Sequence, residues 1–350
     1  MQSLSVLCHW FYSNALSKYK KRLIYCRARG KAGRKMSENE KVKEKGKILS
    51  GIGGLYRVIT ENGRILECRA RGNFRFDKIS PYPGDNVTVT EEKNGASVID
   101  GILPRKNFFE KPPAANIDTL FITVSTATPS PSYITIDKLA VAAEYYGAET
   151  VIIVTKSDLS PEKAEELRGV YGKSGYRVFV TSSESAEGVS ELLSFIKNEG
   201  VGRTSFFAGE SGVGKSSLLN ALFPSLMLKT GEVSRKIYRG KHTTRAVTLY
   251  PLEENPTEKS ACLADTPGFG IFDLASIDSI VKEDIEKLFP EFSEFSSDCR
   301  YRKCTHLREE GCEVLRAVQD GKIAWQRHES FVKIYEEIKA AHPFSSKKNK

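Results

Sequence analysis

The sequence predicts a multidomain α/β protein with a small β-barrel, a doubly wound parallel sheet and a helical C-terminal region. Three observations lead to this prediction. Short alternating strands fill residues 47–105, strands and helices alternate from residue 119 onward, and residues 209–216 read GESGVGKS, a phosphate-binding motif. The expected parts are 1–46, a basic extension; 47–111, a barrel; 112–273, a nucleotide-binding domain; 274–343, a metal-binding helical domain; and 344–350, a disordered tail.

Composition describes a globular protein without a membrane span. The chain has 350 residues, of which 40% are hydrophobic and 28% charged, enough for two or three cored domains. No apolar run approaches the roughly 18 residues that a membrane helix needs. Residues 1–35 contain nine Lys or Arg and no acid, so they carry the whole formal charge of +9. Any contact with a polyanion must therefore come from local patches of the remaining chain.

The basic first 35 residues have three competing interpretations. Their Arg- and Ser-containing, acid-free composition resembles an organellar transit peptide. They also fit a disordered basic arm, or a segment assigned from a start codon upstream of Met36. Residues 8–15 are too short and polar for a secretory signal core. We expect a cytoplasmic monomer, with organellar targeting by residues 1–35 left open.

The barrel prediction rests on turn signals between short strands. Residues 55–60 and 64–71 alternate around an Asn62-Gly63 turn, and residues 87–90 and 96–103 supply further strands. Several strands in some sixty residues favour an oligonucleotide-binding (OB) type of barrel. A basic and aromatic mixture suits RNA, although it also fits a solvated face over a barrel core: Arg69, Arg71, Phe74, Arg75, Phe76 and Lys78.

After a linker at residues 111–114 the pattern changes to a parallel sheet. Strands are predicted at 119–124, 151–154, 178–180, 204–208 and 261–264, and helices at 136–146, 161–171, 189–197 and 217–223. Ser160 and Pro161 are expected to cap the second helix. Residues 314–341 have a helical pattern.

The motif at 209–216 lies between a strand and a helix, as a phosphate-binding loop must. Its three glycines let backbone N–H groups face phosphate oxygens, Lys215 reaches the β- and γ-phosphates, and Ser216 can ligate Mg²⁺. The predicted phosphate contacts are Gly209, Glu210, Ser211, Gly212, Val213, Gly214, Lys215, Ser216, Ser217 and Gly268.

Two strand ends predict a guanine site. Residues 155–158 read TKSD, close to the guanine-specificity element, and Asp158 can accept two hydrogen bonds that adenine cannot donate. Lys156 can lay its aliphatic stem over the base. Residues 181–183 form a second base loop. The predicted guanine contacts are Thr155, Lys156, Ser157, Asp158, Thr181, Ser182 and Ser183.

Downstream residues complete a nucleotide switch. The Gly-, Ser- and Lys-rich stretch from 229 to 245 fits a switch loop, and residues 265–268 read DTPG, with Asp265 near Mg²⁺ and the Gly268 N–H near the γ-phosphate. The predicted magnesium ligands are Ser216, Thr243, Thr244 and Asp265.

A second, structural metal site is predicted near the C-terminus. The spacing Cys299-x₄-Cys304-x-His306-x₅-Cys312 supplies three thiolates and one imidazole, a closed tetrahedral set for one Zn²⁺. The chain has seven cysteines and no secretory signal, which argues against a disulfide framework.

The order of the motifs is unusual, because the guanine loops precede the phosphate loop. Such a domain can still close if the permuted ends lie near each other. With a barrel in front and a Cys₃His knuckle behind, this circularly permuted P-loop GTPase pattern resembles the RsgA (YjeQ) family of ribosome small subunit-dependent GTPases. The resemblance covers about residues 47–340.

Two residues depart from common GTPase patterns. Thr155 stands where most GTPases carry Asn, which can cost one base or loop-bracing hydrogen bond. Phe269 follows Gly268 where Ras-like proteins carry a water-orienting Gln, so slow intrinsic hydrolysis is expected. His242 is the candidate internal catalytic group beside Lys215; the alternative is an ordinary loop histidine.

The resemblance implies a slow, Mg²⁺-dependent GTPase that binds the small ribosomal subunit and its rRNA during late maturation or quality control. It also implies that subunit contacts stimulate hydrolysis of GTP to GDP. The zinc and helical region follows directly after residues 265–268, so movement at the γ-phosphate is expected to reach it. Two alternatives stay open: an RNA-binding regulatory module whose nucleotide is structural, and an ATP-dependent enzyme, against which Asp158 argues.

Overall fold

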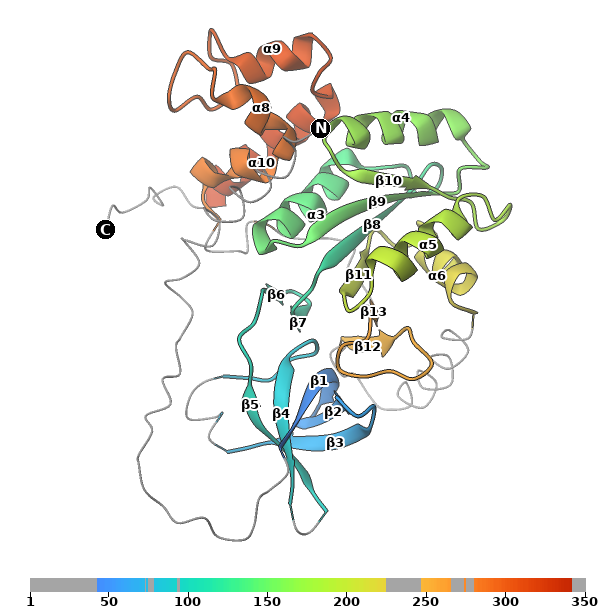
Figure 1. Ribbon diagram of the computed structural model, residues 1–350. Helices are drawn as coiled ribbons and strands as arrows, with labels where there is room; N and C mark the ends of the chain where they lie inside the picture. Colours follow the sequence, from blue (N-terminus) through green and yellow to red (C-terminus); the bar gives the residue numbers. More distant parts are fainter. Residues whose placement is uncertain are drawn as a thin grey trace, which may run out of the picture. The chain divides into compact units, whose positions relative to one another are not determined.

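The computed structural model describes residues 43–72, 74, 79–92, 95–224, 247–265, 274 and 280–341 (Figure 1). The first strand, β1 (Lys43–Ile52), begins four residues before the predicted barrel boundary at Lys47. Most of the predicted extension, the predicted tail and the loop at 229–245 lie outside the described residues.

The N-terminal strands form the expected closed barrel. They are β1, β2 (Leu55–Thr60), β3 (Ile65–Ala70), β4 (Asn86–Glu91) and β5 (Ser97–Ile102). Their order is β1-β2-β3-β5-β4, and β4 pairs back with β1, while β3 and β5 are parallel. The hairpin predicted around Gly63 is confirmed by the antiparallel pairing of β2 with β3. A five-stranded OB-type barrel is therefore present.

One aromatic of the predicted RNA-binding mixture belongs to the barrel core instead. Phe74 is 8% exposed and packs with Ile48, Val58 and Ile99 inside the barrel. The interpretation of Phe74 as a surface ring was wrong, because its ring fills the apolar interior that five short strands must close. Phe76, Arg75 and Lys78 lie outside the described residues.

A short two-stranded sheet replaces the predicted linker. Strands β6 (Phe108–Glu110) and β7 (Pro113–Ala115) pair antiparallel, and the Lys111–Pro112 peptide bond between them is cis. Phe109 is fully buried and its ring centroid lies 4.4 Å from that of Tyr146. The segment is thus packed against the nucleotide-binding domain.

The second part of the chain forms the predicted doubly wound sheet. Its order is β10-β9-β8-β11-β13-β12, with every neighbour parallel except β12. The strands are β8 (Thr119–Ser125), β9 (Glu149–Thr155), β10 (Arg177–Val180), β11 (Thr204–Ala208), β12 (Thr248–Pro251) and β13 (Cys262–Asp265). β12 was not predicted, and its Thr248 pairs with Ser50 of β1, so the barrel and this sheet share one hydrogen-bonded ladder.

Helices cover both faces of this sheet (Figure 1). The helices are α3 (Tyr133–Tyr146), α4 (Pro161–Lys173), α5 (Val189–Glu199) and α6 (Lys215–Leu222). α5 and α6 pack on one set of strand side chains, such as Phe121 and Ile153, while α3 and α4 pack on the alternate set, such as Ile122 and Ile152. α4 begins at Pro161 as predicted, although Ser160 makes no side-chain capping bond.

The C-terminal region extends the core on the α3 side. Its elements are the 3₁₀ helices η2 (Lys282–Leu288) and η3 (Pro290–Phe292) and the helices α8 (Ser293–Ser296), α9 (Glu313–Gln319) and α10 (Trp325–Ala341). Phe289, Phe331 and Ile334 belong to the same hydrophobic cluster as Leu139 of α3. No helix in the described part of the chain is both long and apolar enough to span a membrane.

Candidate nucleotide and metal sites

The phosphate loop joins the end of β11 to the start of α6 and has the predicted conformation. Gly209, Gly212 and Gly214 have φ angles of 142°, 85° and 98°. A Cβ atom on Gly209 would lie 2.3 Å from the Thr123 carbonyl oxygen, so only glycine fits there. α6 begins at Lys215, so the loop presents N–H groups and a helix N-terminus to an anion.

Lys215 is folded over this loop. Its Nζ donates hydrogen bonds of 2.6 Å to the carbonyl oxygens of both Gly209 and Glu210. Burial lowers the pKa of Lys215, and the Glu210 carboxylate acts in the opposite direction. Ser216 and Ser217 lie in the first turn of α6, and Val213 is buried beneath the loop. The arrangement is suited to a polyphosphate.

The two predicted base loops lie side by side. β9 and β10 are parallel neighbours, so the loops that follow them leave the same edge of the sheet. The Ser157 N–H donates to the Thr181 carbonyl at 3.2 Å, and Ser182 Oγ donates to Asp158 Oδ1 at 2.5 Å. Asp158 and Ser183 are exposed. Ser182 therefore orients the carboxylate that we predict to read guanine.

The TKSD loop is also bonded directly to the phosphate loop. Thr155 Oγ1 lies within hydrogen-bond distance of the carbonyl oxygens of Val213 and Val124. Lys156 Nζ donates to the carbonyls of Gly212 at 2.9 Å and Thr128 at 2.6 Å. Thr155 replaces the Asn of most GTPases, and the loss of a loop-bracing hydrogen bond was therefore in question. The bond is present, because the Thr155 hydroxyl still reaches the phosphate loop.

The predicted switch residues are only partly described. β13 pairs in parallel with β11, which brings the backbone of Asp265 to the edge from which the phosphate loop leaves. His242, Thr243, Thr244, Gly268 and Phe269 lie outside the described residues. Their roles, and the side-chain role of Asp265, stay predictions.

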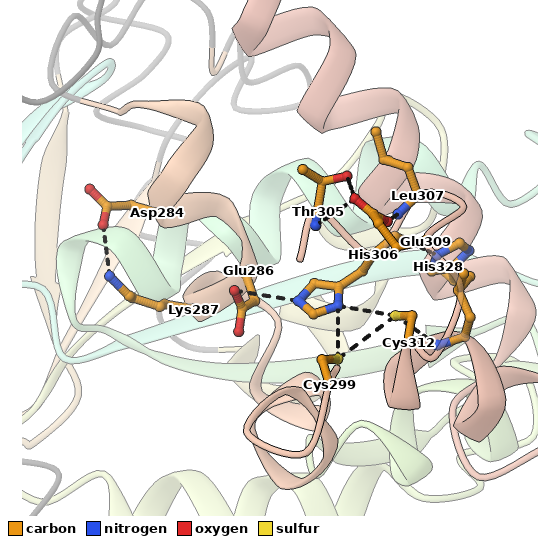
Figure 2. Close-up of polar contacts among 11 residues, drawn as sticks. Asp284, Glu286, Lys287, Cys299, Thr305, His306, Leu307, Glu309, Cys312 and His328 are labelled. Atoms are coloured by element: carbon orange, nitrogen blue, oxygen red, sulfur yellow. Dashed lines mark hydrogen bonds and ion pairs between the residues drawn. The ribbon is translucent and has the colours of Figure 1, made fainter. Parts of the chain in front are cut away.

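The four predicted zinc ligands converge on one point. The ligand atoms of Cys299, Cys304, His306 and Cys312 all lie within 4.8 Å of one another and could hold a metal ion. His306 Nδ1 is 3.3 Å from the Cys312 sulfur and 3.7 Å from the Cys299 sulfur (Figure 2). Burial is the main cause that raises the pKa of Cys304 to about 12, so a bound cation would be needed to keep this thiol ionised.

Two carboxylates that sequence reasoning missed support this cluster (Figure 2). Glu286 Oε2 lies 3.4 Å from His306 Nε2, on the side of the ring opposite the thiols, an ion-pair distance without hydrogen-bond geometry. Glu309 accepts bonds from the Thr305, Leu307 and Arg308 N–H groups. Glu286 could not be identified from sequence because it precedes Cys299 by more than ten residues. Glu309 lies between the predicted ligands His306 and Cys312, so its position in the sequence could have indicated a supporting role.

Glu309 also has a strongly shifted titration. Burial acts to raise its pKa, but hydrogen bonds from Thr305 and from backbone N–H groups outweigh burial and lower the pKa to about 2. The carboxylate is therefore ionised throughout the physiological range and fixes the loop that carries His306.

The described barrel surface retains part of the predicted basic mixture. Arg69 is exposed opposite Leu55, which is 41% exposed. Arg71 is also exposed, but its Nε pairs with Asp100 Oδ1 at 2.5 Å.

Comparison with known proteins covers both main domains. The RsgA GTPase family matches residues 102–275, and the RsgA N-terminal domain matches residues 45–99. A relative from Caldanaerobacter subterraneus subsp. tengcongensis is 42% identical over 297 residues, covering 84% of this chain and 95% of the relative. A relative from Enterococcus faecalis is 38% identical over 309 residues, covering 87% and 99%. Both are named small ribosomal subunit biogenesis GTPase RsgA.

Solved structures agree over nearly the same span. The crystal structure of YjeQ from Thermotoga maritima matches with a TM-score of 0.68 and 33% identity, covering 85% of this chain and 99% of that one. The crystal structure of YloQ, described as a circularly permuted GTPase, matches with a TM-score of 0.69 and 30% identity, covering 87% and 98%. The fold, the barrel and the permuted motif order are shared.

Proposed function

This chain belongs to the RsgA family of GTPases, and we propose that it hydrolyses GTP at the phosphate and guanine loops to drive a late step in maturation or quality control of the small ribosomal subunit. It is an enzyme of the GTP hydrolase class. The role on the subunit follows from the names of its relatives.

The observation that supports this proposal best is the set of bonds between the two halves of the site. Thr155 and Lys156 contact the phosphate loop, and Ser182 contacts Asp158. Base and phosphates would therefore be held by one connected group of side chains, although the motifs occur in permuted order. A connected site for guanine and for a polyphosphate supports the proposal of GTP as the bound nucleotide.

The chain's own residues account for binding and positioning. Backbone N–H groups between Gly209 and Ser216 would bind the phosphates, and Lys215 would turn from the loop carbonyls toward them. Asp158 would accept the guanine N1–H and 2-amino hydrogens. Ser216 and Asp265 would hold Mg²⁺, whose chemistry is to neutralise charge on the β- and γ-phosphates. Thr243 and Thr244 are the further proposed magnesium ligands.

Water activation needs a group other than the residue that follows Gly268. Phe269 cannot orient water, so we assign slow basal hydrolysis and propose His242 as the group that acts on the water. A group supplied by the ribosome is the alternative. The phosphate loop and Lys215 would position the phosphates, and this contributes to the rate of hydrolysis whichever group activates the water.

We propose that the metal in the Cys₃His cluster is Zn²⁺ and that its role is structural. Three sulfurs and a ring nitrogen are the donors that Zn²⁺ prefers, and four protein ligands leave no open position for a substrate. Glu286 on the far ring nitrogen is the kind of outer partner that such histidines have. The cluster would hold the loop between α8 and α9.

A second candidate function is an RNA-binding module whose nucleotide is structural. It differs from the proposed enzyme because its GTP turnover would not rise with small ribosomal subunits. We therefore propose measuring GTP hydrolysis by the full chain with and without purified small ribosomal subunits. Slow basal turnover and stimulation of roughly 10²- to 10⁴-fold are expected, the scale on which a supplied catalytic group acts. Turnover that does not rise with subunits contradicts a subunit-dependent enzyme and favours the alternative.

Asp158→Asn is the matched variant for this assay. An amide at this position would favour xanthosine triphosphate over GTP, and the loss for GTP is expected to be about 1–3 kcal/mol, as for an unpaired buried polar group. Unchanged preference in a competition assay would remove Asp158 from the base site while leaving the turnover result intact.

A further inference from the structure

Arg327, at the start of α10, is a fully buried cation held by two carboxylates. It is 0% exposed, and its Nη1 donates to Asp137 Oδ1 at 2.6 Å. Its Nε and Nη2 donate to the two carboxylate oxygens of Glu291 at 2.6 and 3.1 Å. These bonds join α10 to α3 and to η3, so one side chain connects the C-terminal region with the nucleotide-binding domain.

Aromatic rings from both domains surround this guanidinium. Its central carbon lies 4.5 Å from the Phe289 ring centroid, 5.3 Å from that of Tyr176 and 5.9 Å from that of Tyr171. A buried ion group of this kind adds little net stability, because desolvation offsets the attraction between the charges. It does fix geometry, since a shift of either domain would leave a buried charge unpaired. The junction is therefore suited to holding α3 in one position.

The N-terminal end of α3, which carries Asp137, also reaches the nucleotide site at two points. Ser132, Thr135 and Ile136 line a small hollow together with Gly209 and Glu210 of the phosphate loop. In the loop before α3, the Thr128 carbonyl accepts from Lys156 Nζ, which also donates to Gly212. Asp137 is one residue beyond Ile136. A displacement of α3 would thus reach both the guanine loop and the phosphate loop.

We propose that Arg327 is a positioning residue for the nucleotide site, acting through Asp137 and α3. This inference rests on the proposed function only in assuming that guanine nucleotide binds at the phosphate loop. Nucleotide binding and the packing of α10 are then coupled, and coupling in binding is reciprocal. Nucleotide should alter the surroundings of α10, and loss of the Asp137 tie should weaken nucleotide binding.

Trp325 reports on this coupling. The chain has two tryptophans, and Trp10→Phe leaves Trp325, which is 62% exposed and lies two residues before Arg327. In the full-length Trp10→Phe protein, GDP is expected to change Trp325 emission. Adding Asp137→Asn, which keeps the side-chain shape, should abolish that change and weaken GDP binding by about 5- to 10-fold, at the lower end of the usual range of coupling.

Lys138→Gln is the matched control. Lys138 is the next residue of α3 and pairs with Glu337 of α10 at 2.6 Å, but these side chains are 23% and 35% exposed. Partly exposed ion pairs contribute little. Lys138→Gln should therefore keep both the GDP affinity and the Trp325 response.

A third variant separates positioning from stability. The combination Asp137→Asn, Glu291→Gln and Arg327→Met removes every charge of the group, so the melting temperature should recover relative to Asp137→Asn alone. If GDP affinity stays low and GDP does not change Trp325 emission in this variant, the positioning role of Arg327 is supported. If GDP affinity and the Trp325 response recover together with the melting temperature, the proposal is overturned. It is also overturned if GDP does not change Trp325 emission in the Trp10→Phe parent protein. A parent protein that does not bind GDP would contradict the proposed function instead.

Discussion

The carboxyl group of Glu144 on α3 has a pKa of about 7, raised mainly by burial. Arg327 opposes this shift and Glu291 adds to it. At pH 8 the folded protein therefore contains an ionised carboxylate in a partly desolvated site. Near pH 6 that carboxyl is protonated, whereas the same group in the unfolded chain has the ordinary glutamate pKa of 4.5 and stays ionised. The folded state then binds more protons than the unfolded state.

By linkage, the contribution of Glu144 to stability falls as pH rises from about 4.5 through 7. Lowering the pH from 8 to 6 should raise the free energy of unfolding by about 1 kcal/mol through this residue. Urea unfolding at both pH values measures it. Glu144→Gln should abolish that component, and a pH dependence that the variant leaves unchanged would assign the effect to other groups.

Single residues also show the limits of sequence reasoning. The phosphate-loop glycines could be identified because their spacing expresses a backbone requirement, and the structure gives all three a positive φ. The bracing role of Thr155 could not be identified, since its hydroxyl donates to the carbonyl of Val213, which is 58 residues later in the chain. Phe74 was misplaced because an aromatic in a short basic stretch has the same local pattern whether it points inward or outward.

At the level of elements, long periodic segments were predictable and short irregular ones were not. α3 ends at Tyr146 and is capped by Gly147, as its helical pattern and terminal glycine indicated. β12 has four residues and ends in a proline, so it offers no alternating pattern. η2 and η3 belong to the 3₁₀ class, whose three-residue repeat lacks an amphipathic 3.6 period. These elements are fixed by packing against distant parts of the chain, which local sequence does not encode.

The knuckle between α8 and α9 gives an element-scale prediction. Protein purified without added zinc should contain about one Zn²⁺ per chain, the ratio of a single closed site. Cys304→Ser should release the metal and destabilise the C-terminal region by several kcal/mol, because the binding energy of a structural zinc is part of its folding energy.

Metal analysis and limited proteolysis of the region after residue 280 measure the two effects. Cys262→Ser is a suitable control, since Cys262 is a buried cysteine of β13 outside the cluster. Zinc retained in Cys304→Ser at the wild-type ratio would contradict the proposed ligand set.

At the scale of the whole molecule, charge is distributed unevenly along the chain. The formal charge of +9 equals the nine cations of residues 1–35, so the remaining chain is neutral. Non-specific RNA binding depends on the number of neutralised phosphates, with a salt slope of about −0.7 per contact for single strands. Specific stimulation by a subunit depends instead on how the folded domains fit it.

Removal of residues 1–35 should therefore separate the two activities. Affinity for an unrelated single-stranded RNA at low salt is expected to fall at least about tenfold, with a shallower salt dependence. Subunit-stimulated GTP turnover of the truncated protein should stay within about twofold of that of the full chain. The reason is that the residues proposed to bind and hydrolyse GTP belong to the folded domains. Filter binding across a salt series and a turnover assay measure these, and loss of stimulation on truncation would place residues 1–35 in the subunit contact.

The permuted strand order has a consequence for synthesis on the ribosome. β8, β9 and β10 are consecutive in the chain and adjacent in the sheet, so they can pair as soon as they have left the exit tunnel. β11 must then join the exposed edge of β8, and β13 must follow on β11. A nascent chain shorter than this carries the loops predicted to contact the base but lacks the predicted phosphate-binding loop. Capture of nucleotide is therefore expected only after β11 and α6 have been made.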